Sequence, residues 1–272
     1  MQNKYSDGSF RLTITGSCDF EDDFYRLRKS PLFSGVDTES GRLFAYSGIF
    51  IDYHYDAEKD VLYMTSNFLS SYEELQVAKS LFSCIIDMYV IANMSIQVEF
   101  IYNTLSDVSI LNIIRTACAN EELQCAFLRL YDNPECAVLQ KPELHSYLAS
   151  NGTCLKLNKI KSLLNYGEEV YLFDLQKVFD RPAIVSLYLG NNLKYLEALV
   201  CFFFHLLQYA IRSRKMHGHI KNVASMSYFR SRLMNIGLRG KEFLSIRKDL
   251  YKLFSEGYGL KEVVSYDSDG NV

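Results

Sequence analysis

The sequence lacks the short motifs that most often identify enzyme chemistry. It contains no G-x-x-x-x-G-K-S/T phosphate loop, no dinucleotide-binding glycine pattern, no H-E-x-x-H zinc motif and no G-x-S-x-G nucleophile elbow. Glycine and proline are scarce, with 14 and 4 among 272 residues, so long linkers and low-complexity segments are not expected. Nucleotide-driven and hydrolase-triad chemistry therefore have no support, and a compactly folded chain is expected.

The cysteines form no recognisable framework. There are seven of them, an odd number, and no two are arranged as C-x-x-C. Scattered thiols of this kind are typical of reduced, mostly buried cysteines in a cytosolic protein, and not of disulfides or a zinc site. We therefore expect a cytoplasmic protein that uses no metal and no cofactor.

No segment has the pattern of a secretory signal or a membrane span. The N-terminus has no charged region followed by an apolar one, so export by the usual route is not expected. The two most apolar segments, 81–94 and 196–211, are interrupted by polar residues such as Asp87 and Glu197. Neither segment supplies the roughly 20 clean apolar residues of a spanning helix, so a membrane is not an expected partner.

The net charge of −3 hides a strong segregation along the chain. Residues 212–252 contain eleven basic residues against two acidic ones, a net charge of +9, so the remainder carries −12. A basic third on an acidic body is the electrostatic signature of an anion-binding surface, and nucleic acid is the commonest large anion in a cell. Alternatively, the basic side chains are solvated helix faces that pair with the acidic half or with a partner.

The first 140 residues mix strand and helix patterns, which favours an α+β region. Alternating or β-branched runs predict strands at 10–15, 43–55, 61–64, 95–102 and 135–140. The five residues 56–60 predict the turn of a hairpin. A Ser-Tyr-Glu-Glu sequence from Ser71 is a capping-box start for a helix to about Asn93, and 106–119 predicts another helix.

From Pro142 onward the sequence is dominated by helical periodicity. The predicted helices are 142–150, 157–165, 170–179, 192–217, 220–235 and 239–256. The predicted organisation is therefore an α+β domain at 1–140, a helical-bundle domain at 141–260 and a flexible tail at 261–272.

The predicted helix 192–217 is the most informative segment. Its apolar run carries a polar stripe in which His205, Arg212 and His219 are spaced by seven residues. Basic residues crowd its C-terminal turn, as the helix dipole prefers, and Gly218 supplies the stop. In an unbroken helix, Arg212 and His217 would point about 140° apart, so the two converge only if the last turn opens or if two protomers share one cleft.

The residue types at this helix end suit RNA cleavage without a metal. Such cleavage needs a base for the 2′-hydroxyl proton, an acid for the leaving 5′-oxygen and positive charge on the phosphate. His217 transfers protons near neutral pH, and Arg212 can clamp a phosphate with two parallel hydrogen bonds. The further candidates for binding nucleic acid are Ser213, Arg214, Lys215, His219, Lys221, Arg230 and Arg232, with Tyr209, Tyr228, Phe229 and Tyr251 as stacking platforms.

The segment Tyr209-x-Ile211-Arg212-Ser213-x-x-x-His217-Gly218 resembles the signature of the HEPN superfamily, in particular its abortive-infection and Apea-like branches. In that signature a long apolar helix leads to an arginine that is followed four to six residues later by a histidine. The resemblance covers about the last third of the chain. It implies a helical bundle, a symmetric homodimer through the 192–217 helix, and metal-independent endoribonuclease activity in antiviral defence, toxin action or RNA processing, with Arg212 and His217 as the catalytic pair.

Two non-catalytic alternatives stay open. Residues 226–232, a glycine turn at Gly237 and a basic helix from Arg239 are arranged as in a helix-turn-helix, which suits a DNA-binding regulator. Core packing of the aromatic and leucine side chains explains the same pattern. The other alternative is an effector-like interaction protein whose acidic N-terminal half binds a protein partner.

Overall fold

The computed structural model describes residues 8–18, 24–118, 136–137, 142–150, 156–164, 170–171, 173–191, 193–213 and 226–257. Its strands and helices confirm the α+β class. The chain divides into two compact units: unit 1 takes Met1–Asn103 and Arg181–Glu197, and unit 2 takes Thr104–Asp180 and Ala198–Val272. The sequence predicted a single boundary at residue 140. In the structure unit 1 instead ends its first segment at Asn103 and takes a second, later segment, Arg181–Glu197. The predicted tail, 261–272, lies outside the described residues.

Unit 1 is built on an antiparallel sheet. Its elements are β1 (Ser9–Ser17), η1 (Tyr25–Lys29), β2 (Phe33–Asp37), β3 (Arg42–Ala45), β4 (Phe50–Asp56), β5 (Val61–Ser66), α1 (Tyr72–Tyr89), β6 (Ala92–Tyr102), β10 (Ala183–Gly190) and η2 (Leu193–Tyr195). The strands of this unit follow the order β2-β3-β4-β5-β1-β6-β10. Strands far apart in sequence therefore lie side by side at its centre.

The register of the central strands aligns apolar side chains into buried rows. Leu12 of β1 lies opposite Val98 of β6, and Val98 lies opposite Leu187 of β10. All three side chains have no exposed surface. Burying a side chain of this size stabilises the fold by about 2 kcal/mol. The alternation predicted for β1 is thus confirmed, because every second residue faces the core. In β6 the predicted inward residues Ile96, Val98 and Phe100 are buried, but Glu99 between two of them is buried as well.

The predicted strand 43–55 is two strands in the structure, β3 and β4, and the single-strand prediction was wrong. Gly48 adopts a φ of +80°, a conformation that glycine accepts without steric cost, and its N–H donates to the Ala45 carbonyl. The turn from β4 to β5 falls at residues 57–60, as the hairpin prediction required.

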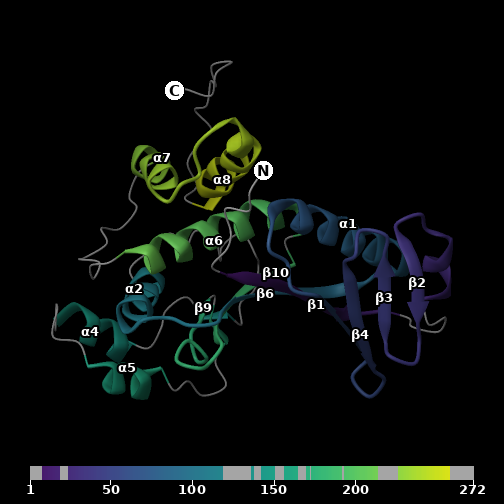
Figure 1. Ribbon diagram of the computed structural model, residues 1–272, viewed down its shortest axis with the longest axis horizontal. Coiled ribbons are helices and arrows are strands. Elements are labelled where there is room, and N and C mark those ends of the chain that lie inside the picture. Colours follow the sequence, from purple (N-terminus) through teal and green to yellow (C-terminus); the bar gives the residue numbers. More distant parts are fainter. Residues whose placement is uncertain are drawn as a thin grey trace. The chain divides into compact units, whose positions relative to one another are not determined.

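α1 runs along one face of the sheet of unit 1 (Figure 1). Its buried face is spaced as a core-facing helix requires and includes Leu75, Phe82 and Ile85. The Ser71 Oγ accepts the Glu74 N–H at 3.1 Å, which confirms the predicted cap. The helix ends at Tyr89 and not at residue 93, because Val90 takes a left-handed conformation.

β10 was missed by the sequence interpretation, which assigned mainly helical structure after residue 142. Its residues, Ala183 to Gly190, read as a short β-branched and aromatic run between Pro182 and Gly190, so a local strand signal was present. Most of its side chains are buried, and it pairs antiparallel with β6 along most of its length.

Unit 2 contains most of the helices. Its elements are α2 (Asp107–Cys118), β7 (Cys136–Ala137), α4 (Pro142–Ser150), α5 (Leu157–Leu163), β8 (Val170–Tyr171), β9 (Phe173–Asp174), α6 (Leu196–Arg212, whose first two residues belong to unit 1), α7 (Met226–Asn235), η3 (Lys241–Phe243) and α8 (Leu244–Gly257). The prediction of a helix at 170–179 was wrong, since short strands and a turn occupy that range. One of these strands, β8, pairs in parallel with β7, and the helical interpretation of the range did not predict this pairing.

Within unit 2, α6 lies between α2 on one side and the pair α7–α8 on the other (Figure 1). Phe229 of α7 joins the second contact: its ring lies 6.0 Å from that of Phe202 on α6 and stacks at 4.3 Å on Phe254 of α8. Aromatic contacts of this kind add to the gain from burial. They fix the position of α7 against the middle of α6.

Candidate nucleic-acid interface

α6 is the most apolar of the described helices, and the polar side chains of its C-terminal half share one face. Counted from His205, the residues Gln208, Tyr209 and Arg212 follow at three, four and seven positions, within an arc of about 100° at 3.6 residues per turn. Nearly all other side chains of the helix are buried. We call His205, Gln208, Tyr209 and Arg212 the α6 stripe.

The segment Leu193–Arg212 is long and apolar enough to cross a membrane by length and composition alone. However, 72% of its apolar window is buried inside the protein. A core helix passes the same test, and this one uses its apolar side chains to pack against α2, α7 and α8. A cytoplasmic location stays a prediction.

Side chains from α2 cap the C-terminal end of α6. Asn112, which has no exposed surface, donates from Nδ2 to the carbonyl oxygens of Ala210 and Ser213, both at 3.3 Å. Ser109 donates from Oγ to the Ile211 carbonyl at 3.3 Å. The Ala210 and Ile211 carbonyls belong to the last turn of the helix, where no later N–H reaches them in the usual pattern, and the Ser213 carbonyl follows directly after it.

Because of these caps, α6 ends at Arg212, and the prediction of a continuous helix to residue 217 was wrong. Ser213 has already left the helical conformation. Arg212 and His217 are therefore not held about 140° apart by one unbroken helix, which was the geometric obstacle to their convergence. Arg212 itself is exposed.

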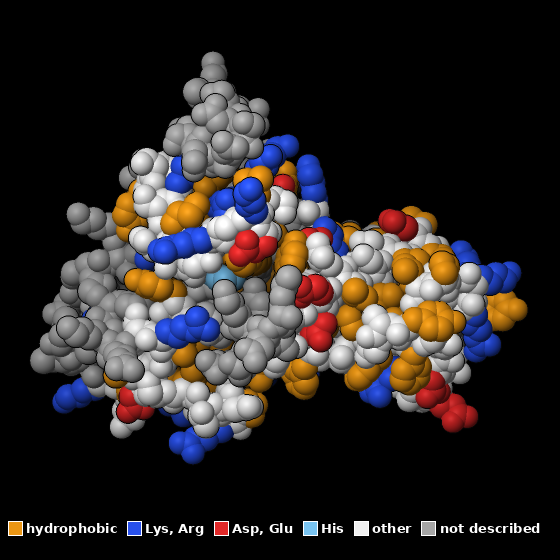
Figure 2. Space-filling model, turned by 45° about the horizontal axis from the view of Figure 1, so that its top comes forward, with side chains coloured by type: hydrophobic (Ala, Val, Ile, Leu, Met, Phe, Trp, Pro, Cys, Tyr) orange, Lys and Arg blue, Asp and Glu red, His pale blue; other side chains and the backbone are white. Residues whose placement is uncertain are grey.

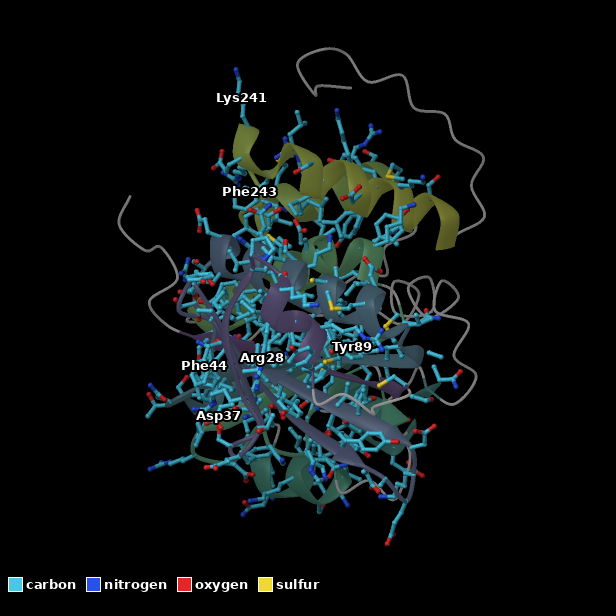
Figure 3. The ribbon with its side chains drawn as sticks, turned by 90° about the vertical axis from the view of Figure 1, so that its right-hand side faces the viewer. Arg28, Asp37, Phe44, Tyr89, Lys241 and Phe243 are labelled. Atoms are coloured by element: carbon cyan, nitrogen blue, oxygen red, sulfur yellow. The ribbon has the colours of Figure 1, made fainter. Side chains whose placement is uncertain are left out.

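His205 lies at the start of the stripe, against the connection between α7 and α8. Its Nδ1 is 3.3 Å from the Ile236 carbonyl oxygen, and its ring meets that of Phe243 edge to face at 5.2 Å. In Figure 3, Phe243 points back towards the helices while Lys241 extends outwards. Burial lowers the pKa of His205, the Ile236 carbonyl opposes that effect, and the Arg212 charge adds to the lowering. His205 is therefore held in its neutral form.

Gln208 carries a buried amide that the fold does not satisfy. Its side chain is 6% exposed, and neither Oε1 nor Nε2 has a hydrogen-bond partner in the described structure. An unsatisfied buried amide is rare in native proteins and destabilises the fold. This residue therefore requires an explanation other than stability.

Arg232 of α7 meets the stripe at Tyr209. Its guanidinium carbon lies 5.5 Å from the centre of the Tyr209 ring, a cation–π contact, and its Nη2 is buried without a hydrogen-bond partner. Burial lowers the pKa of Arg232, while the hydroxyls of Tyr228 and Tyr209 oppose that effect. No carboxylate among the described residues forms an ion pair with this half-buried cation.

Arg230, two positions earlier, occupies a similar setting on the other side of α7. Its guanidinium carbon lies 5.3 Å from the centre of the Tyr251 ring on α8, and its Nε is buried without a partner. The two arginines thus turn to different neighbouring helices. Only Arg232 lies beside the α6 stripe.

Lys and Arg side chains outnumber Asp and Glu over the part of unit 2 formed by α7 and α8 (Figure 2). The described basic residues there are Arg230, Arg232, Arg239, Lys241, Arg247, Lys248 and Lys252. Not all of them are available to a ligand. Arg247 is 8% exposed and donates from Nη1 to the Leu238 and Gly240 carbonyls, so it holds the turn before α8.

The predicted site residues divide into two sets. The structure places Arg212 at the exposed end of α6 and Ser213 directly after it, with Arg230 and Arg232 on α7. Arg232 lies over the ring of Tyr209, and Arg212 follows Tyr209 by three positions on the same face of α6. The other predicted residues, Arg214, Lys215, His217, His219 and Lys221, lie outside the described residues.

Sequence reasoning did not identify Ser109 and Asn112, which determine where α6 ends. They lie about 100 positions earlier in the chain, and their role depends on the packing of α2 against α6. No pattern in the sequence indicates that contact. The pairing of Tyr209 with Arg232 likewise depends on tertiary packing.

The connection between α7 and α8 differs from that of a helix-turn-helix. It spans Ile236–Phe243, includes η3, and turns at Gly237 and Gly240, both with positive φ. A helix-turn-helix typically uses a turn of three or four residues. Phe229, Leu233 and Leu250 are buried, as the core-packing interpretation of these helices requires.

The described residues contain no group of three or more His, Cys, Asp or Glu side chains that could hold a metal ion. The prediction that the protein uses neither metal nor cofactor stays a prediction.

In comparisons with known proteins, no family model matches the chain and no curated protein matches it significantly.

Proposed function

We propose that the protein is a metal-independent endoribonuclease of the HEPN type, which acts on RNA at the C-terminal end of α6. Arg212 and His217 are the proposed catalytic pair. The observation that carries the proposal is that α6 ends at Arg212, because a single unbroken helix through residue 217 would hold the pair about 140° apart. The basic character of α7 and α8 supports an RNA ligand.

In the proposed reaction His217 accepts the proton of a 2′-hydroxyl, whose oxygen then attacks the adjacent phosphorus. The bond from phosphorus to the 5′-oxygen breaks, and an acid returns a proton to that oxygen. The products are a 2′,3′-cyclic phosphate and a 5′-hydroxyl. Arg212, exposed at the helix end, stabilises the additional negative charge on the phosphate.

The finer parts of the proposal follow the HEPN resemblance. Unit 2 is proposed to contain the helical bundle, to form a homodimer through the 192–217 segment and to work in the cytoplasm in antiviral defence or toxin action. Unit 1, which carries much of the acidic charge, is proposed to bind a protein partner. Size-exclusion chromatography with light scattering tests the dimer directly.

The decisive experiment incubates mixed single-stranded RNA with wild type, His217→Ala and Arg212→Ala in excess EDTA, with fragment ends analysed. We expect cyclic-phosphate ends with wild type, none with His217→Ala, and loss of both cleavage and affinity with Arg212→Ala. His54→Ala is the matched control, because His54 is an exposed histidine on β4 of unit 1. RNA that remains intact with wild type, at concentrations where it binds, would reject catalysis.

That last outcome would favour the non-catalytic alternative, in which the same surface binds nucleic acid without cutting it. The unpaired guanidinium of Arg232 supports binding of an anion in either case. A DNA-binding regulator would be distinguished from an RNA-binding protein by tighter binding to duplex DNA than to single-stranded RNA.

A further inference from the structure

We propose that one end of unit 1 is a docking surface for the anionic headgroups of a lipid bilayer. The surface joins η1 to the C-terminal end of α1, and we call it the η1 patch; its residues are Tyr25, Arg26, Arg28, Lys29, Leu32 and Val90. The sequence gave no reason to expect a membrane partner, since no segment suits a spanning helix, but a peripheral contact requires no such helix. The contact involves unit 1 alone and does not depend on RNA cleavage.

Ring contacts hold η1 against the C-terminal end of α1. The Arg26 guanidinium carbon lies 5.3 Å from the centre of the Tyr89 ring, and the Phe24 ring meets that ring edge to face at 5.0 Å. In the view that faces this end of unit 1, Arg28 and Tyr89 lie next to each other (Figure 3). Tyr89 is the last residue of α1, so Val90, the next residue, lies at the same end of unit 1 as η1.

The segment after η1 is attached to α1 as well. The Ser30 Oγ lies 3.7 Å from the Cys84 Sγ of α1 and accepts the Leu32 N–H at 3.3 Å. The Arg28 guanidinium carbon lies 5.7 Å from the centre of the Tyr25 ring. The cations and the apolar side chains of the patch therefore belong to one continuous part of unit 1.

Val90 is the member of the patch that the stability of the fold explains least. It takes a left-handed conformation, with φ 51° and ψ 50°, and 81% of its surface is exposed. A β-branched residue rarely adopts this conformation, and glycine or asparagine usually follows a helix that ends in this way. Packing does not offset the strain, because the side chain is exposed. An apolar environment that Val90 enters on binding explains why an apolar side chain is kept here.

Further exposed apolar side chains of the patch lie beside cations. Tyr25 is 58% exposed and Leu32 is 41% exposed. The range 24–36 contains three basic residues, all exposed, and no acidic residue. Figure 2 shows hydrophobic side chains next to Lys and Arg at the far right, which is this end of unit 1. Apolar side chains that enter the bilayer interface, with cations beside them for the headgroup phosphates, are typical of peripheral membrane contacts.

The side-chain types favour a bilayer over a nucleic acid or a peptide. Leu32 and Val90 are aliphatic and offer no ring on which a base could stack, and Arg28 already lies over the ring of Tyr25. Peptides usually bind along a groove or a sheet edge, whereas Val90 and Tyr25 expose most of their surface. Each Lys or Arg near an anionic surface strengthens binding about fivefold, so three of them give a reversible contact that salt weakens.

One acidic residue of the described chain opposes this contact. Asp87 is exposed in the last turn of α1, three positions before Val90. Anionic headgroups repel its charge, so Asp87→Asn should strengthen binding to anionic vesicles by up to about fivefold. Damage to the fold would weaken binding, so the sign of this change reports the electrostatics of the patch. Weaker binding by Asp87→Asn would contradict the proposal.

The first test measures cosedimentation with vesicles of phosphatidylcholine, with and without about one third phosphatidylserine. Wild type should bind the anionic vesicles at low salt, and the double variant Arg28→Gln/Lys29→Gln should bind about 25-fold more weakly. The matched control is Lys59→Gln/Lys194→Gln, which removes two exposed positive charges elsewhere in unit 1 and should stay within about threefold of wild type. All variants keep the four acidic residues at 19–23, which lie outside the described residues. Equal losses in the two double variants, or no binding by wild type, would overturn the proposal.

The second test locates the contact. The sequence contains no tryptophan, so a single introduced tryptophan reports its own surroundings. In Val90→Trp we expect emission at shorter wavelength and protection from iodide when anionic vesicles are added. Phe68→Trp is the control, because Phe68 is 57% exposed and precedes α1, whose 18 residues separate it from Val90 by about 27 Å. Protection of Phe68→Trp but not of Val90→Trp would show that vesicles bind elsewhere, and the proposal would be wrong.

The third test separates binding from stability at Val90. Val90→Asn relieves the backbone strain, so we expect the midpoint of thermal unfolding to rise by about 2–4 °C while vesicle affinity falls several-fold. A lower midpoint with unchanged vesicle affinity would show that Val90 serves the fold. Binding of a single-stranded oligoribonucleotide tests the other anionic ligand: if Arg28→Gln/Lys29→Gln weakens it and leaves vesicle binding unchanged, the patch belongs to nucleic acid and the lipid assignment is rejected.

Discussion

Arg42 in unit 1 and Arg232 in unit 2 occupy similar stacked positions with different counter-ions. Arg42 lies 4.1 Å from the Phe50 ring centre and donates from Nε to Asp52 at 2.5 Å. Arg232 lies over a ring in the same manner but has no carboxylate among the described residues. In unit 1 the sheet register places Asp52 directly opposite Arg42. The difference teaches that the sheet register supplies the counter-ion of Arg42, whereas no described residue supplies one for Arg232.

Two further carboxylates of unit 1 have partners of their own. The buried Glu99 pairs with Arg11, its register partner on the neighbouring strand. Glu197 accepts hydrogen bonds from Lys79 Nζ and the Tyr72 hydroxyl, both at 2.8 Å. These contacts hold the fold together and require no ligand.

The largest expected effect tests a polar contact that unit 2 does use for its own structure. Asn112→Ala leaves the carbonyls of Ala210 and Ser213 without their donor, so the free energy of unfolding should fall by about 2–4 kcal/mol. Urea denaturation measures it. Asn103→Ala is the control, because Asn103 is exposed. A loss below about 1 kcal/mol would show that the cap at the end of α6 is not needed.

The next largest expected effect tests whether the ion pair of Glu197 and Lys79 stabilises unit 1. Glu197→Gln removes a partly buried charge that Lys79 balances, so we expect the free energy of unfolding to fall by about 1–2 kcal/mol. Glu73→Gln, an exposed substitution in the first turn of α1, should change it by no more than about 0.5 kcal/mol. Equal results for both variants would contradict the structural role given to the Glu197 pair.

The pH dependence of stability separates the units further. Burial raises the pKa of Glu197, but the hydrogen bonds from Lys79 and Tyr72 outweigh it and lower the pKa below 4.5. Burial lowers the pKa of His205 below 6.5. Both groups therefore contribute stability that is present above the unfolded-state pKa and is lost as the pH falls through the folded-state pKa.

Glu197 and His205 affect stability over different pH ranges, so substitutions can show which group is responsible for each range. Between pH 6.5 and 5 the unfolded state takes up a proton at His205 before the folded state does, and stability should fall with a slope of at most about 1.4 kcal/mol per pH unit. In His205→Phe this slope should become shallower. Glu197→Gln should change the slope only below pH 4.5. An unchanged slope in His205→Phe above pH 5 would refute this assignment.

The smallest expected effect addresses the two arginines themselves. Arg42→Gln loses both a ring contact and a carboxylate partner, so unfolding should become easier by about 1 kcal/mol. Arg232→Gln loses a ring contact but also relieves an uncompensated buried charge, and its change should not exceed about 0.5 kcal/mol. Denaturation of both variants in the same buffer without phosphate makes this comparison. A larger loss for Arg232→Gln would remove the contrast between the units.

Local patterns were sufficient to predict several elements. The Ser71 cap, the alternation of β1 and the glycine turns after α7 each depend on neighbouring residues, and each is present in the structure. The end of α1 was missed because Val90 adopts a left-handed conformation that valine rarely takes. The short strands β8 and β9 carry too few residues for a periodic signal.

The site was only partly predictable for a related reason. Arg212 and Arg232 were found from charge and motif spacing, which are visible in one sequence. The unsatisfied amide of Gln208 was not, because satisfaction is a property of every neighbour in space. The end of α6 depends on Asn112, and only the folded chain shows that contact.

The late position of β10 also sets the order in which the ribosome can complete unit 1. Roughly 80 residues of unit 2 separate Asn103 from Arg181, and their synthesis at about 5–20 residues per second takes about 4–16 s. During that interval β6 has emerged without its β10 partner, and its backbone N–H and C=O groups on that side form an open strand edge. The speed of translation through Thr104–Asp180 therefore sets how long the nascent chain presents that edge to its neighbours on the polysome.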